Sequence, residues 1–236
     1  MTPTIFVLLL ATASTASLDA DVDHRWATTG MYPMWDTTGT VLEHRHAHVG
    51  TSAAIFGIGD VAEVGTTPTV LILRVPNLQA KVAVVSSGPL YVAVQLAAYL
   101  ILPGANDSFA SSRYTSRIYN PDQSLLATPL SVATTWRVTP WLSVHNTLTA
   151  VGVTAKAPIK SDLHVGDFVT VEMLAVAYHS LFLHVGEIGF WDHDQTVFGV
   201  SYRLSWDWLE ARIGYFYRDT PDGMQSQPLA SVAIQL

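Results

Sequence analysis

Apolar and polar residues alternate along most of this chain, most clearly in residues 195–218. Before Asp207 the even-numbered positions are apolar, and after it the apolar row moves to odd-numbered positions such as Leu209 and Tyr217. A period of two places alternate side chains on opposite faces of a strand. Two such segments around a tight turn predict an antiparallel hairpin with one apolar face, and each has the roughly ten residues that a tilted strand needs to cross a bilayer.

The same alternation recurs along the chain and predicts twelve strands. They are expected at residues 40–49, 52–58, 61–73, 78–86, 90–102, 128–138, 141–153, 167–178, 181–191, 195–206, 208–218 and 228–236. Every second connection is a turn of two or three residues, and the longest loop covers 103–126. Short turns at one end, longer loops at the other and an even strand number predict an all-β, antiparallel, up-and-down transmembrane β-barrel. Ten strands remain the alternative if the first two segments are loops.

Four places depart from the regular pattern. Pro68 is unfavourable inside the third segment, because proline removes a ladder donor and belongs at an edge or a bulge. The alternation breaks near Gly186 and Glu187, which predicts a bulge there. Residues 154–166 and 219–227 are polar and are expected to be loops.

The N-terminal region shows no strand period. Residues 1–20 combine a short apolar core with small residues, which predicts a secretory signal peptide, although no Lys or Arg precedes the core. Residues 21–38 are expected to form a periplasmic lead-in that can fold into the barrel mouth. The outer-membrane barrel is expected to cover 39–236.

Composition supports a membrane barrel over a soluble one. Charged residues make up 13% of the chain, against about 25% in ordinary soluble domains. A soluble sandwich or lipocalin-like barrel would alternate with its apolar face inward, but twelve inward apolar faces would overfill one core. Aromatic residues gather near the predicted strand ends, as in a membrane girdle: Trp136, Trp141, Tyr178, Trp206 and Trp208 at one end, and Tyr99, Trp191, Tyr215 and Tyr217 at the other.

Charge and cysteine content bound the partners. The net charge is −7 and no basic run occurs, which argues against a nucleic-acid partner. The absence of cysteine fits passage through an oxidising periplasm.

Over residues 39–236 the chain resembles bacterial outer-membrane β-barrels as a class. The terminal VAIQL, residues 232–236, is similar to the signal that such proteins present to their insertion machinery, but it ends in Leu236 where they usually have Phe or Trp. Residues 57–65 are similar to a hairpin of porin-like barrels. The resemblance implies a Gram-negative outer membrane as the location, with membrane lipid, the insertion machinery and small solutes as partners.

Outward apolar rows would leave the polar rows lining a lumen. The expected lumen-lining residues are His44, His46, His48, Glu63, Lys81, Gln95, Arg137, His145, Glu172, Arg203, Glu210 and Arg212. A twelve-stranded interior is wider than the smallest barrels, whose side chains fill the space. This predicts a narrow porin-like channel for small polar solutes or ions, tuned by its charged walls. The alternative is a salt-bridged, closed interior that stabilises the shape.

Three histidines two residues apart, His44, His46 and His48, would share one strand face at about 6.6 Å spacing, close enough for two of them to bind a metal ion. The flanking segments offer no carboxylate, so we interpret the histidines as polar lumen residues that could make conductance acid-sensitive. The sequence thus assigns no metal site, cofactor or catalytic residue.

Two other function classes stay open. Outer-membrane acyl hydrolases place a His-x-Ser pair on the lipid-facing wall, whereas Ser143 and His145 here occur in the reverse order and in a lumen-facing row. A structural or adhesive barrel could use the 103–126 loop, with Arg113, Tyr114, Arg117 and Tyr119, for contact.

Overall fold

The computed structural model describes residues 35–105, 123–156, 159–176, 178–188, 195–206, 208–220 and 223–236. The expected signal peptide, the lead-in before Trp35, Trp191 and most of the longest loop lie outside the described residues.

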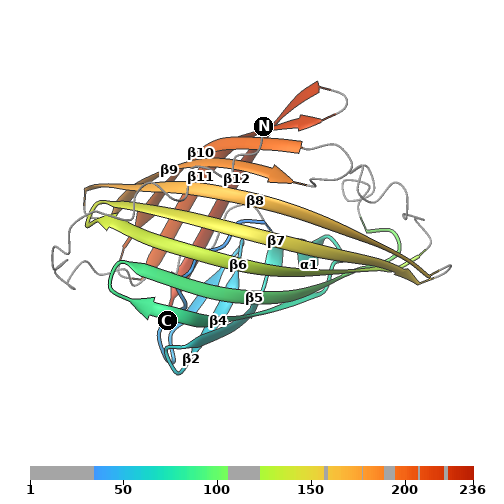
Figure 1. Ribbon diagram of the computed structural model, residues 1–236, viewed down its shortest axis with the longest axis horizontal. Helices are drawn as coiled ribbons and strands as arrows, with labels where there is room; N and C mark the ends of the chain where they lie inside the picture. The colour runs from blue at the N-terminus through green and yellow to red at the C-terminus, as the bar shows by residue number, and fades with distance from the viewer. Residues whose placement is uncertain are drawn as a thin grey trace.

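The chain forms one closed antiparallel β-barrel of twelve strands, in which each strand pairs with its neighbours in sequence and β12 closes against β1 (Figure 1). The fold class and the strand number are therefore confirmed. The elements are β1 Ala47–Gly50, β2 Ala54–Ile58, β3 Ala62–Thr66, α1 Pro68–Ile72, β4 Asn77–Ser87, β5 Leu90–Ile101, β6 Leu125–Thr139, β7 Leu142–Lys156, β8 Ile159–Val176, β9 His179–Ile188, β10 Gln195–Ser205, β11 Leu209–Thr220 and β12 Gly223–Gln235. Within the described part of the chain, no helix is long and apolar enough to span a bilayer.

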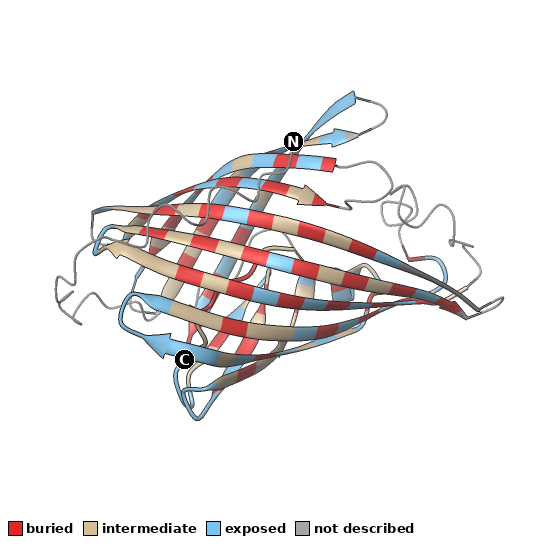
Figure 2. Ribbon diagram, in the orientation of Figure 1, coloured by how far each residue is buried: buried red, intermediate tan, exposed pale blue. Residues whose placement is uncertain are grey.

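The apolar rows face outward. Leu96, Leu130, Leu148, Val185 and Ile213, on five different strands, are all exposed. Their sequence neighbours on each strand point inward, so buried and exposed residues alternate along the ribbons (Figure 2). Exposed apolar side chains around a closed barrel are stable in lipid and unfavourable in water.

The first three strands are shorter than predicted. Arg45 has a φ of 63°, which breaks the pleat, so β1 begins only at Ala47 and not at residue 40. Pro68 occupies the first turn of α1, a position that tolerates its missing N–H, so the expected strand over 61–73 ends at Thr66. β1, β2 and β3 therefore hold only 4 or 5 residues each.

Other strands are longer than predicted. The described residues of the expected loops over 154–166 and 219–227 are instead strand, since β7 reaches Lys156, β8 starts at Ile159, β11 reaches Thr220 and β12 starts at Gly223. At residues 223–227 both faces of β12 are exposed, so neither face of this stretch needs an apolar row. The predicted bulge at Gly186 is also wrong, because the pairing of β9 with β8 and β10 runs through it without a shift.

The barrel interior has two layers. The half nearest the short turns is polar and charged. The half nearest the loops is apolar. Its residues come from α1, the α1–β4 connection and the inner faces of β5 to β11: Val70, Val75, Tyr99, Ile101, Leu125, Val153, Phe168, Ile188, Val197 and Phe216. Tyr99, expected in the outer girdle, is only 1% exposed and faces this layer.

Candidate functional site

Residues 35–42, which we call the strap, run inside the barrel along its wall. Trp35 lies against Gly166 of β8, where an added Cβ would come within 2.6 Å of the indole ring. Asp36 lies with Oδ2 3.8 Å from Nδ1 of His184 on β9. The N–H of Thr37 donates to Oγ1 of Thr147 on β7 (3.2 Å), and that hydroxyl donates back to the carbonyl of Thr37 (2.7 Å).

The second half of the strap reaches the opposite wall. The N–H of Gly39 donates to Oγ1 of Thr135 on β6 (2.9 Å), and the N–H of Leu42 donates to Oε2 of Glu63 on β3 (2.8 Å). Gly39 is required by space, since a Cβ there would lie 2.7 Å from the backbone nitrogen of Thr135. The strap thus contacts strands from β9 round to β3, and it is hydrogen-bonded to lumen-facing side chains of β7, β6, β5 and β3.

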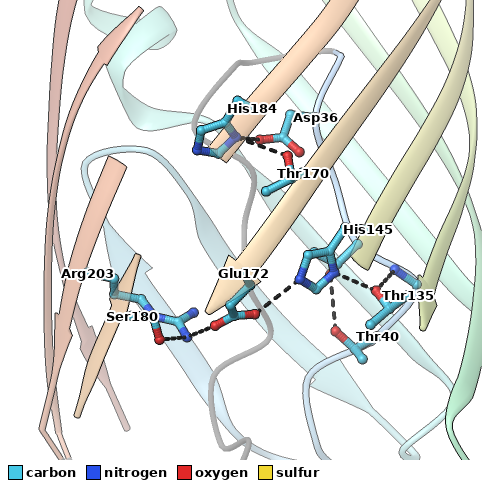
Figure 3. A network of polar contacts seen from close by, with 11 residues as sticks. Asp36, Thr40, Thr135, His145, Thr170, Glu172, Ser180, His184 and Arg203 are labelled. Carbon is cyan, nitrogen blue, oxygen red and sulfur yellow. Dashed lines mark hydrogen bonds and ion pairs between the residues drawn. The ribbon is translucent and has the colours of Figure 1, made fainter. Parts of the chain in front are cut away.

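A chain of polar contacts links the strap to buried charges (Figure 3). His145 is the direct cross-strand partner of Thr135, and its Nδ1 lies 2.9 Å from the Thr135 hydroxyl. Its Nε2 lies 3.1 Å from Oε2 of Glu172. Because the ion-paired carboxylate of Glu172 only accepts, the Nε2–H of His145 donates to it.

The carboxylate of Glu172 also forms an ion pair with Nη2 of Arg203, and the same nitrogen donates to Oγ of Ser180 (3.1 Å). Glu172 stands on β8, Ser180 on β9 and Arg203 on β10, so the ion pair crosses an intervening strand. A buried carboxylate bonded on both oxygens is held in one geometry.

A second ladder of polar contacts, across β8, β9 and β10, lies closer to the apolar layer than the contacts of Glu172 do. Nδ1 of His184 lies 3.0 Å from the hydroxyl of Thr170, and its Nε2 lies 2.8 Å from Oγ of Ser201. The rings of Phe168, Phe182 and Phe216 surround the imidazole, with centroids 6.2, 6.0 and 4.9 Å away. The ladder therefore sits at the boundary between the charged and the apolar layers.

Two further charge groups line the charged layer. Nζ of Lys81 on β4 lies 2.8 Å from Oε1 of its direct cross-strand partner Glu63, whose other oxygen holds the strap. On the far side, Arg203 and Arg212 are also direct cross-strand partners, and both guanidinium groups lie over the Phe182 ring, at 5.0 and 4.6 Å from its centroid.

The sequence-predicted lumen residues are buried, half-buried or, as for His44, exposed. His48, Glu63, Lys81, His145, Glu172, Arg203, Glu210 and Arg212 are buried inside the barrel. Gln95 and Arg137 are half-buried; Gln95 accepts from the Thr37 hydroxyl, and Arg137 lies over the ring of Tyr91.

The three histidines do not lie on one strand face inside the barrel, so the prediction that they share such a face is wrong. His44 is exposed, and its Nδ1 accepts from the N–H of Gly59; the side chain of His46 is 40% exposed. Only His48 is buried, because the turn at Arg45 rotates the preceding residues out of the strand. No group of three potential metal ligands occurs among the residues that the structure describes.

Sequence reasoning missed Asp36, Thr170, His184 and Ser201. His184 and Ser201 lie in the inward rows of β9 and β10, so the alternation alone would have found them. It also missed that large aromatic rings fill the interior beside glycines: Phe168 occupies the space above Gly186, and Phe216 that above Gly199. Glycines in the inward rows were the available signal.

Comparisons with known proteins add the following. Neither the family models nor the curated proteins gave a match to this sequence. Among solved structures, the outer-membrane expressed OmpT of Vibrio cholerae is similar over 94% of this chain and 70% of that chain, with 10% identity and a TM-score of 0.47. The fold itself rests on the strand pairing: a closed, antiparallel, twelve-stranded barrel that resembles the outer-membrane β-barrels.

Proposed function

We propose that this protein is a bacterial outer-membrane β-barrel that acts as a narrow channel for small polar solutes or ions, with a lumen that the strap narrows. The observation that carries the proposal is the combination of an apolar exterior with a charged interior, in which Glu63, Lys81, Glu172 and Arg203 all point inward. Lipid-facing apolar rows suit a membrane wall, and charged inner walls suit the passage of polar solutes.

A purely structural barrel gains little from such an interior. Buried ion pairs stabilise a fold weakly, because desolvation offsets much of the attraction, and apolar residues of similar size often do as well. The strap is held by hydrogen bonds from Thr37, Gly39 and Leu42, each worth about 1 kcal/mol net. Such a segment can be displaced without unfolding the wall.

The test is solute flux through the purified full chain in liposomes, with a size-graded series of neutral sugars and small ions. We expect small solutes to pass and larger ones to be excluded. Flux no greater than in protein-free liposomes, for every solute and for strap-displacing variants, would refute the channel. Flotation of the protein with outer-membrane fractions tests the location separately.

A hydrolase is the second candidate, for a reason different from the one the sequence offered. Both ring nitrogens of His145 are engaged by Thr135 and Glu172, so its pairing with Ser143 is not supported. The structure instead places Oγ of Ser201 2.8 Å from Nε2 of His184, whose Nδ1 faces Asp36 at 3.8 Å. In ester hydrolysis, Ser201 would attack the carbonyl, His184 would pass the proton to the leaving alcohol, and water would then release the acyl group.

A fluorophosphonate probe tests this candidate directly. Covalent labelling that is lost in Ser201→Ala and kept in Ser143→Ala would support a nucleophile at Ser201. Equal signal in the wild type and Ser201→Ala would leave the ladder a structural contact.

A further inference from the structure

One part of the charged layer has polar atoms without partners. It lies on the β10–β11–β12 wall and consists of Arg203, Glu210 and Gln235, which are 6%, 3% and 9% exposed. Nε and Nη1 of Arg203, Oε2 of Glu210 and Oε1 of Gln235 are buried and have no hydrogen-bond partner among the described residues. Burial of an unsatisfied polar atom destabilises a fold, so the wall is arranged to receive polar groups from elsewhere.

These residues lie close together by register. Arg203 is opposite Arg212, two residues from Glu210 on β11, and Glu210 is opposite Ala233, two residues from Gln235 on β12. Diagonal neighbours on one face of an antiparallel sheet lie about 7–8 Å apart. The donors of Arg203 and the acceptors of Glu210 and Gln235 therefore lie along one diagonal of the inner wall, with Glu210 between the other two.

The charge balance of this region indicates the kind of ligand. Arg203 and Arg212 contribute two positive charges, and Glu172 and Glu210 contribute two negative ones. A simple anion would gain from the arginines but would be repelled by the two carboxylates. A simple cation would be attracted by the two carboxylates but repelled by the two arginines. A solute with zero net charge and separated charged groups can satisfy the donors and the acceptors together.

We propose that Arg203, Glu210 and Gln235 form a binding site for a small zwitterionic solute. Its carboxylate would accept from the free N–H groups of Arg203, and its ammonium group would donate to Oε2 of Glu210 and Oε1 of Gln235. The site gives the channel proposed above a preferred substrate class, and its transport consequence rests on that function.

Glycine and its neutral isomer glycolamide are matched probes, since they differ in charge separation and not in composition. In liposomes with the full chain, we expect glycine flux to exceed glycolamide flux by about threefold or more. A fraction of the binding free energy of one charged hydrogen bond is enough for that ratio. Glu210→Gln keeps the volume, removes the charge and should bring the ratio near one. Asp219→Asn, an exposed carboxylate on the same strand, is the matched control and should keep the wild-type ratio. Arg203 is left intact because it also holds Glu172.

Binding is measured separately, by saturation-transfer NMR of glycine with the full chain in deuterated detergent. Transfer to glycine that exceeds transfer to glycolamide, and that falls in Glu210→Gln, supports the site. If the same protein lets no solute cross the liposome membrane, the channel is refuted and the binding site is not. Flux without glycine preference, together with equal transfer to both isomers, overturns the site and leaves ordered water as its occupant. Folding of each variant is checked by the heat-modifiable gel mobility of the barrel.

Discussion

Glu172 and Arg203 form a buried ion pair although they stand on strands that do not touch. β9 lies between β8 and β10, and its Ser180 contributes a hydroxyl to the same guanidinium nitrogen. The pair therefore ties three neighbouring strands together from the inside. Through His145 and Thr135 it also connects to the strap.

Replacing Glu172 by Gln should destabilise the barrel strongly. The change leaves the buried charge of Arg203 without its counter-ion, which typically costs about 3–5 kcal/mol. The measurement is the urea midpoint of unfolding in lipid vesicles. The double variant Glu172→Gln with Arg203→Met should recover part of the loss, whereas additive losses would show that the two side chains do not interact in the folded state.

Replacing Gly39 by Val should displace the strap and raise conductance. A Cβ at this position would lie 2.7 Å from the backbone nitrogen of Thr135, so the segment must leave the wall. The readout is single-channel current in planar bilayers. Gly152→Ala, which changes a strand glycine beside Thr128 and away from the strap, is the control and should leave the current unchanged. A folded Gly39→Val barrel with wild-type current would contradict the gating role of the strap.

Replacing Gly186 by Val should destabilise the barrel by about 1–3 kcal/mol, the usual cost of overpacking. The reason is that the Phe168 ring occupies the space where the new side chain would be. Adding Phe168→Ala to Gly186→Val should return part of the stability, and this rescue is the decisive comparison. If the double variant is less stable than Gly186→Val alone, the ring and the glycine are not complementary.

Replacing Pro228 by Val should promote self-association. β1 ends at Gly50, opposite Ala233, and the backbone of Thr51 bonds to Val232. Among the strands that the structure describes, the part of β12 before Val232 pairs with β11 alone. The backbone of Val232 bonds toward Thr51, and by the two-residue period Pro228 points its missing N–H toward the same open edge. Proline at an edge blocks strand addition. Light scattering of the purified variant should show a larger species; an unchanged mass would indicate that other features protect the edge.

The sequence predicts the wall well because a period of two, repeated twelve times, defines both the strands and their faces. Glu172 and Arg203 were placed inside for that reason. Their pairing was not predictable, since it depends on the stagger of three strands, which alternation does not encode. The strap has no period at all, and its course is determined by contacts with Thr147, Thr135 and Glu63.

The errors have local physical causes. A positive φ at Arg45 delays the start of the first strand to Ala47. Pro68, which is unfavourable inside a strand, marks the start of a helix and not a bulge. At residues 223–227 both faces of the strand are exposed, so neither face needs an apolar row. At the end of β7, Ala155 is buried in the apolar layer, but its neighbours Thr154 and Lys156 are polar, which is why the sequence suggested a loop.

The short β1–β3 wall makes the barrel unequal in height. Strands of 4 or 5 residues rise only about 13–17 Å, less than the hydrocarbon thickness of about 30 Å in a typical bilayer. On that side α1, with exposed Leu71 and Ile72, continues the surface where strand is missing. Hydrophobic mismatch with the bilayer should therefore be concentrated on the β1–β3 side. We expect the barrel to tilt, or the lipid beside these strands to be thinner than the lipid around the rest of the barrel.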